Sequence, residues 1–302
     1  MNDQQKMTRR DVYQYVTDRV LDRLEAGEIP WVNTRSKPLL AARSYTTGNR
    51  YRGVNAFLLS IQNGASPFWL TFRTTKEAGG NVRKGAKSRI AVFWKTYSPK
   101  EELSKPEDER KSYPVLRYYN VFSLDDCEGI SCPLADAVDN PDPVERAEGL
   151  IAGYIDQTDN GPAVEHGSSG RAFYRVEEDR CVIPQRSHFT STAAYYRTFF
   201  HELVHSTGSK ARLDRFETAI ATHEFGHNDY SLEELVAELG AAMLLAHCGL
   251  FEEMADKSAS YLFHWKRALQ ADSKLIVKAA GRAQRAVDHI LGVKPESSPE
   301  AE

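Results

Sequence analysis

Cysteine is scarce in this chain of 302 residues, which holds four cysteines in total. A disulfide-stapled scaffold needs a far higher density, so that class of small secreted protein is excluded. Cys127 and Cys132 are separated by four residues, but no second pair follows to complete a zinc ribbon. We therefore expect free thiols, as in a reducing cytoplasm.

Long hydrophobic runs are also missing. The longest apolar stretches, such as residues 240–246, fall far short of the roughly 20 residues that a membrane-spanning helix needs. The opening segment MNDQQKMTRR is polar and no apolar segment follows it, so no secretory signal is expected. The composition, 41% hydrophobic and 27% charged, is typical of a globular protein. A cytoplasmic protein with no membrane partner is expected.

Acidic residues are almost absent from residues 31–100. This segment holds thirteen lysines and arginines against one acid, Glu77, although the net charge of the chain is −3. The contrast predicts two functions, one of them directed at a polyanion. Ten aromatic residues are interleaved with these bases. Basic side chains that follow phosphates and rings that stack on bases are typical of proteins that bind single-stranded DNA.

Motifs that read duplex DNA are missing as well, because the sequence contains no helix-turn-helix or zinc finger. Sequence-tolerant binding of single-stranded DNA is therefore favoured over base readout. The alternative is that the basic residues form a solvated surface that binds no ligand and that most of the aromatic residues belong to the hydrophobic core. Phe57, Phe72 and Phe93 are expected to be such core residues. The candidate DNA contacts are Arg50, Tyr51, Arg52, Trp69, Arg83, Lys84, Lys87, Arg89, Trp94 and Lys95.

Apolar periodicity and turn residues divide the chain into two parts. Prolines among Asp and Asn indicate a linker over residues 131–143. Residues 293–302 are expected to be a disordered tail. Before the linker we expect a helix over 8–27 and strands over 68–72, 89–94 and 115–122. After it we expect a helix to 155, strands over 172–176 and 180–183, a helix over 191–208 and helices from 231 to about 291.

The pattern His-Glu-x-x-His, a common mark of zinc hydrolases, occurs twice, at 201–205 and at 223–227. Metal binding needs this pattern on a helix, because residues four apart then share a face. The first copy lies in a predicted helix that Ser191 caps and Gly208 ends. The second contains Gly226 and precedes weak helix formers, so it is predicted to be a loop without a metal.

The first copy supplies His201 and His205 as metal ligands and Glu202 as the general base that takes a proton from water. The alternative is that the motif occurs by coincidence: the two histidines would then form hydrogen bonds within the protein, and Glu202 would have no catalytic function. A catalytic site also needs a third ligand. A further histidine six residues on is absent, because position 211 is Ala.

Three glutamates of a later predicted helix are candidates for the third ligand. Glu234 and Glu238 lie four apart and share a face, so one can bind the ion while the other orients a ligand histidine through its ring N–H. Glu233 points about 100° away and is expected to be solvated. Glu238 lies in an apolar run, which predicts burial against a positive group. Glu234 is favoured as the ligand, although Ser231 with Glu234 also fits a capping box.

Several segments together resemble the ArdC family of antirestriction proteins. HELVHSTG (201–208), ARLDR (211–215) and EELVAELGAA (233–242) are similar to its zincin-type metallopeptidase domain. IPW (29–31), YRGVN (51–55), WLTF (69–72) and GGNVRKG (79–85) are similar to its N-terminal DNA-binding domain. The resemblance extends from about residue 8 to residue 290.

The resemblance implies an α+β protein with a single-stranded-DNA-binding domain over residues 1–130. A mainly helical zincin-like metallopeptidase domain is implied over 144–292. It also implies metal ligands at His201, His205 and Glu234, with Glu202 as the base. One divalent ion is expected, zinc in first place and manganese as the alternative, because two histidines and a carboxylate suit several metals.

The function implied is that of a plasmid- or mobile-element-encoded protein that protects incoming DNA, as in conjugation, from host restriction. The metal site predicts a metallopeptidase with a protein substrate that the sequence does not identify. The competing hypothesis is a protein that coats DNA and whose metal site is only structural.

Overall fold

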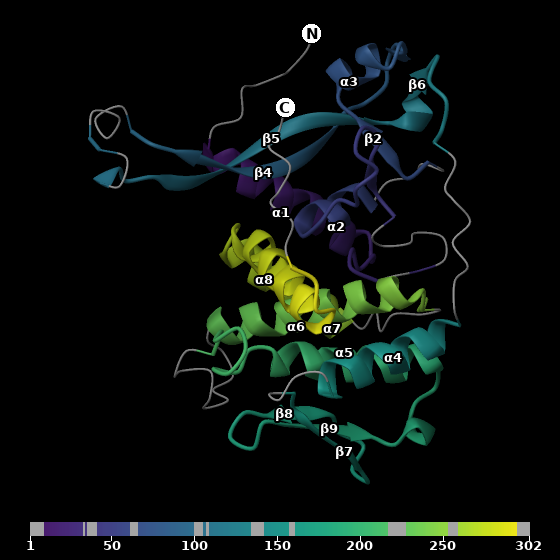
Figure 1. Cartoon of the computed structure of the whole chain (residues 1–302), viewed down its shortest axis with the longest axis vertical. Helices are drawn as coiled ribbons and strands as arrows, with labels where there is room; N and C mark the ends of the chain where they lie inside the picture. Colours follow the sequence, from purple (N-terminus) through teal and green to yellow (C-terminus); the bar gives the residue numbers. More distant parts are fainter. Residues whose placement is uncertain are drawn as a thin grey trace.

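The computed structural model describes residues 9–32, 34, 41–60, 66–99, 105–106, 109–133, 142–156, 161–216, 228–252 and 259–294. The described residues form an elongated molecule, with a sheet at each end and a stack of helices between them (Figure 1). Within these parts of the chain, none of the helices combines the length and the hydropathy needed to cross a bilayer. All four cysteines are described and each is a free thiol, as expected.

The N-terminal half contains a four-stranded sheet in the order β1–β2–β5–β4. β1 is parallel to β2, and the other neighbours are antiparallel. β3 and β6 form a separate antiparallel pair. The elements are α1 (Arg9–Glu25), β1 (Arg43–Ser44), α2 (Val54–Ser60), β2 (Phe68–Leu70), α3 (Phe72–Glu77), β3 (Asn81–Val82), β4 (Arg89–Tyr97), β5 (Tyr113–Ser123), the 3₁₀ turn η2 (Leu124–Asp126) and β6 (Cys127–Glu128).

Helix α1 confirms the helix expected from the spacing of apolar residues. Val12, Val16, Val20 and Leu24 recur every four residues and are all buried, so they form one apolar stripe along the helix. Gly27 follows with a φ of +74°, the left-handed conformation that glycine adopts at helix ends. The stripe belongs to the main hydrophobic core and ties α1 to the sheet and to the C-terminal helices.

The edge of the four-stranded sheet is covered at β4 by helix α2. The Asn55 side-chain amide donates to the Val92 carbonyl at 2.7 Å, and its oxygen accepts from the Val92 N–H at 2.8 Å. These two bonds satisfy edge groups that would otherwise pair with another strand. They also fix α2 beside β4.

Among the described residues, the C-terminal half contains a three-stranded sheet in the order β7–β9–β8 and five helices. α5 packs between this sheet and α6, and α6 packs on α8 (Figure 1). The elements are α4 (Pro143–Asp156), β7 (Ala163–Gly167), β8 (Phe173–Arg175), β9 (Arg180–Pro184), the 3₁₀ turn η3 (Arg186–His188), α5 (Thr192–Ser206), α6 (Asn228–Cys248), α7 (Ala259–Ala271) and α8 (Leu275–Ile290).

The two halves share one hydrophobic core, in which α1 and α2 pack against α8. Polar contacts also cross the junction. The indole N–H of Trp31 donates to the Tyr261 hydroxyl at 3.1 Å, and the Gly53 N–H donates to the Gln284 side-chain oxygen at 2.9 Å. The IPW and YRGVN segments therefore serve to join the halves.

Some predicted elements differ in their limits. The strand expected over 68–72 ends at Leu70, because the Thr71 hydroxyl caps α3. Phe72, expected in the core, is 57% exposed on α3, whereas Phe57 is buried as expected. Ser231 lies inside α6 and so does not cap it. Strand β7 was not predicted. Most of the predicted linker, residues 134–141, and most of the predicted tail, residues 295–302, lie outside the described residues.

Candidate metal centre

Helix α5 carries the first His-Glu-x-x-His copy, as its sequence predicts. The Ser191 hydroxyl accepts from the Ala194 N–H at 3.1 Å and caps the helix. At the other end, the Gly208 N–H donates to the His205 carbonyl at 2.8 Å. The two imidazoles lie one turn apart on one face, with their ring centroids 4.7 Å apart.

Glu234 on α6 completes a three-residue cluster with these histidines. The two Nε2 atoms lie 3.1 Å from each other. The Glu234 oxygens lie 3.6 Å from His201 Nε2 and 3.4 Å from His205 Nε2. All three ligand atoms fall within 4.8 Å of one another. Two imidazole nitrogens and one carboxylate oxygen are a donor set that fits a divalent ion.

The electrostatics of the cluster favour a cation. Burial by itself raises the pKa of Glu234, but hydrogen bonds from both histidines outweigh it and hold the pKa well below its usual range. Burial lowers the pKa of His205, but its contacts with Glu233 and Glu234 outweigh this effect and raise the pKa to about 10.

Glu202, the predicted base, follows His201 on the same helix and is 7% exposed. Its charge contributes to the raised pKa of His205. On the sheet side, the buried Cys181 thiol of β9 donates to the Glu202 carbonyl at 3.5 Å. Glu202 therefore lies in α5 next to His201, with its backbone carbonyl against the three-stranded sheet.

Glu233 was expected to be solvated, and this prediction is wrong. It is 3% exposed, and Arg215 donates to both of its oxygens at 2.7 and 3.1 Å. Its Oε1 atom lies 3.5 Å from His205 Nδ1. Tertiary packing buries this position because Arg215, from the ARLDR segment, supplies a buried charge partner. Glu233 is thus the carboxylate in contact with a ligand histidine.

Glu238 was expected to orient a ligand histidine, and here too the structure differs. Its carboxylate accepts from Arg197 at 2.5 Å, one helical turn before His201. Arg197 also donates to Glu252 at 3.1 Å. The positive partner predicted for Glu238 is confirmed, but its side chain is half-buried rather than fully buried. Its role is to join α5 to α6 beside the site.

The second His-Glu-x-x-His copy, residues 223–227, lies outside the described residues. Its predicted loop therefore stays a prediction. Among the residues that the structure describes, one group of three or more His, Cys, Asp or Glu side chains is arranged to hold a metal ion, and it is the cluster on α5 and α6.

The predicted DNA contacts are not all on the surface. Trp69 is 6% exposed and packs with Leu59 and Ala91 inside the N-terminal half, so it cannot stack on a base. The prediction for Trp69 is therefore wrong, because β2 is an inner strand of the sheet. Tyr51 is half-buried and packs against the same cluster, and burial raises its pKa far above the usual range.

Arg52 also has a structural partner. Its guanidinium forms an ion pair with Asp288, a buried residue of α8. Gln284 donates to the same carboxylate at 3.1 Å. Arg52 therefore lies at the junction of the two halves. Its partner Asp288 is more than 200 residues away in the sequence, so no local pattern around Arg52 predicts the pair.

Other predicted contacts are exposed. Trp94 is 56% exposed on β4. Arg50, Arg83, Lys84, Lys87 and Lys95 are exposed, and Arg89 is half-buried at the start of β4. The sequence reading omitted three exposed residues of the β4–β5 hairpin: Tyr97, Tyr113 and Arg117. Across the two strands, Tyr97 lies opposite Tyr113 and Phe93 lies opposite Arg117. These cross-strand neighbours follow from the strand register, which the sequence does not give.

Two family models match the chain. Residues 10–122 match the N-terminal domain of anti-restriction factor ArdC. Residues 154–282 match a zincin-like metallopeptidase. The matched segments correspond to the two halves described above.

Similar proteins are found in bacteria. The chain is 30% identical to the uncharacterized protein y4eC of Sinorhizobium fredii over 298 residues, which cover 95% of this chain and 93% of that protein. It is 31% and 28% identical to two Escherichia coli proteins named DNA primase TraC. The alignments cover 97% and 99% of this chain, but the chain spans only 28% and 21% of the length of those primases.

The fold is similar to crystal structures of the antirestriction protein ArdC from plasmid R388. The metal-free structure is 32% identical with a TM-score of 0.71, and the match covers 94% of this chain and 100% of that one. The Mn(II)-bound structure is 34% identical with the same TM-score of 0.71, and the match covers 93% and 97%.

Proposed function

Because this chain belongs to the ArdC antirestriction family, we propose that it binds single-stranded DNA and protects incoming plasmid DNA from host restriction. We propose further that its metal centre is a peptidase-like site. The observation that carries this second part is the convergence of His201, His205 and Glu234 next to the buried Glu202.

His201, His205 and Glu234 would hold one divalent ion, with zinc as the first choice and manganese as the second. An ArdC structure with Mn(II) supports a divalent metal and keeps the second choice open. When bound, the ion supplies Lewis-acid chemistry that makes water nucleophilic near neutral pH and polarises a carbonyl. Glu202 takes the proton from the water and returns it to the leaving amine of a peptide substrate.

The DNA-binding part of the proposal rests on the exposed bases and rings of the N-terminal half. Arg83, Lys84 and Lys87 lie in or next to an exposed turn where Gly85 has a φ of +87°. Together with Trp94, they offer phosphate contacts and a stacking surface. Because the sequence contains no helix-turn-helix or zinc finger, this binding is proposed to be sequence-tolerant.

A second candidate is a protective protein that coats DNA and whose metal site is structural. The observation that favours it is the placement of the ligands on two helices. An ion held by His201 on α5 and Glu234 on α6 would fasten these helices together, as the Arg197–Glu238 pair already does.

The decisive experiment compares Glu202→Gln and Glu234→Ala with the unaltered protein. Metal content is measured by mass spectrometry, zinc and manganese affinities by titration, and protection by transfer of unmodified plasmid DNA into a restricting host. We expect Glu234→Ala to lose the metal. We expect Glu202→Gln to keep the metal and to lose peptidase activity, with Glu178→Gln as an exposed control.

The outcomes separate the candidates. If protection is lost in Glu202→Gln while the metal is kept, the catalytic function is supported. If protection survives in Glu202→Gln, the structural role of the metal is supported. Normal metal binding by Glu234→Ala would contradict the ligand set on which both rest.

A further inference from the structure

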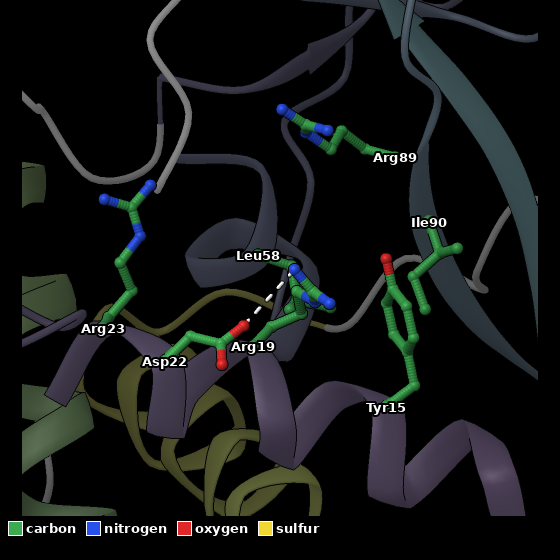
Figure 2. Close-up of a pocket in the computed structure, with 7 residues that line it drawn as sticks. All are labelled: Tyr15, Arg19, Asp22, Arg23, Leu58, Arg89 and Ile90. Carbon is green, nitrogen blue, oxygen red and sulfur yellow. Dashed lines mark ion pairs between the residues drawn. The ribbon is translucent and has the colours of Figure 1, made fainter. Parts of the chain in front are cut away.

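A pocket of about 160 Å³ lies in the N-terminal half where α1, α2 and β4 meet (Figure 2). One face of α1 forms its longest wall, with Tyr15, Arg19 and Arg23 four residues apart. Arg89 at the start of β4 lines the side of the pocket away from α1. The pocket thus lies between elements that the sequence separates by more than sixty residues.

The inner surface of the pocket is apolar. Leu58 of α2 and Ile90 of β4 line it and are both buried. The Tyr15 ring stands beside them, with the Arg19 guanidinium carbon 5.1 Å from the ring centroid. A tyrosine ring next to aliphatic side chains is a surface on which a planar group can pack.

The rim of the pocket is strongly basic. Three arginines line it against one acid, Asp22. Asp22 pairs with Arg19 at 3.3 Å, and Glu28, which is not part of the lining, accepts from Arg23 at 2.9 Å. Arginine presents several donors in a planar fork that matches phosphate oxygens. Three guanidinium groups around one pocket therefore offer N–H donors to an anionic ligand, and to phosphate in particular.

From the apolar floor and the arginine rim, we propose that this pocket binds one nucleotide unit of a DNA single strand. The phosphate would lie among Arg19, Arg23 and Arg89, and the base would pack on Tyr15, Leu58 and Ile90. This inference rests on the proposed single-stranded-DNA binding and gives it a defined site. Arg89 was a predicted contact, whereas Tyr15, Arg19 and Arg23 lie outside the basic segment 31–100 and were not.

The size and surroundings of the pocket agree with a single unit of a longer strand. Pockets for drug-sized ligands measure roughly 300–1,000 Å³, so about 160 Å³ suits one base or phosphate group. Strand β4 leads from Arg89 to Trp94, roughly 17 Å away. Trp94 lies at the same boundary between α1 and β4, with its ring centroid 6.5 Å from that of Tyr13. The exposed Trp94 and Lys95 could thus contact the next nucleotides.

Binding of a fluorescent thymidine oligonucleotide to the full chain tests this proposal. We expect Arg19→Ala to lower the affinity about tenfold and to reduce the slope of log affinity against log salt by about 0.7, the loss of one phosphate contact. Tyr15→Leu should lower the affinity about tenfold because it removes the stacking surface, whereas Tyr15→Phe should bind as the unaltered chain does.

Arg175→Ala is a matched control for Arg19→Ala. Arg175 pairs with an acid three residues on, Glu178, at 3.0 Å and lies 5.0 Å from the centroid of the Phe173 ring. Arg19 likewise pairs with an acid three residues on and lies over an aromatic ring. Arg175, however, belongs to β8 and does not line the pocket. Removing Arg175 should leave the affinity and the salt slope unchanged.

The outcomes distinguish the two levels of the proposal. If the unaltered protein does not bind the oligonucleotide, the proposed DNA binding fails, and this inference fails with it. If it binds but Arg19→Ala and Tyr15→Leu bind equally well, only the pocket assignment is overturned. If thymidine monophosphate competes as tightly as the oligonucleotide, the pocket is a site for free nucleotides and the single-strand assignment is overturned.

Discussion

His205 Nδ1 lies 3.5 Å from Glu233 Oε1, while the other ring nitrogen of His205 faces Glu234. Arg215 donates to both oxygens of Glu233. A carboxylate in this position fixes the tautomer and the orientation of a ligand histidine. Two adjacent glutamates of α6 thus have different tasks, since Glu234 faces the ion site and Glu233 supports His205.

Replacing Glu233 by Gln should weaken metal binding by about 10- to 100-fold, because the ring of His205 loses its charged acceptor. Competition with a chromophoric chelator would measure the change. Glu238→Gln is the matched control, since Glu238 is also an acid of α6 held by an arginine. Its metal affinity should stay close to that of the unaltered protein. Equal losses in both variants would contradict the role of Glu233.

The tryptophans Trp94 and Trp69 should respond in opposite ways to replacement by Ala. Trp94→Ala should reduce single-stranded-DNA affinity by about 1–3 kcal/mol and leave the melting temperature unchanged, because the ring is exposed. Trp69→Ala should lower the free energy of unfolding by about 3–5 kcal/mol, because it opens a cavity in the core. Thermal unfolding and anisotropy titrations would measure both. A melting temperature unaffected by Trp69→Ala would conflict with its burial.

Arg52→Ala should act on stability more than on DNA binding. The ion pair with the buried Asp288 joins the two halves, but Arg52 is about half exposed, so we expect a loss of about 1–2 kcal/mol in the free energy of unfolding. Arg83→Ala, in an exposed turn, should leave stability within about 0.5 kcal/mol and weaken DNA binding. Denaturant titration and anisotropy would separate them. A stable Arg52→Ala variant with weak DNA binding would restore Arg52 as a contact.

Asp179 should make the stability of the protein sensitive to acid. Burial raises its pKa, but hydrogen bonds from Arg212 and Tyr174 outweigh this and lower it below the ordinary value of 3.8. The pair therefore stabilises the fold above about pH 4, and this contribution is lost as the pH falls through the lowered pKa. The effect should be at most about 1 kcal/mol, because Asp179 is 40% exposed.

Urea unfolding between pH 2.5 and pH 6 would test this dependence against Asp179→Asn. Asn tolerates the φ of +47° at this position, so the variant removes the charge without new backbone strain. We expect a flatter pH profile for Asp179→Asn than for Glu178→Gln, which alters only exposed ion pairs. Identical profiles for the two variants would rule out the contribution of Asp179.

Local patterns in the sequence predicted helices α1 and α5 and the two histidines that share a face of α5. The four-residue spacing of Val12, Val16, Val20 and Leu24 predicts α1, and Ser191 with Gly208 limits α5. The spacing of His201 and His205 places two ligands on one face, because the period of a helix is fixed by its backbone. These features depend on neighbours within a few residues, so they are readable without the fold.

Tertiary structure alone decided the partners that come from distant parts of the chain. Glu233 is buried because Arg215 approaches it, and Arg52 is engaged because α8 brings Asp288 to the junction. Trp69 is buried because β2 is an inner strand, which no local pattern revealed. The pocket between α1 and β4 exists only where a helix and a strand far apart in the sequence meet. Whether a charged or aromatic side chain is buried, paired or free to bind a ligand depends on the residues that pack against it, and long-range contacts bring those residues together.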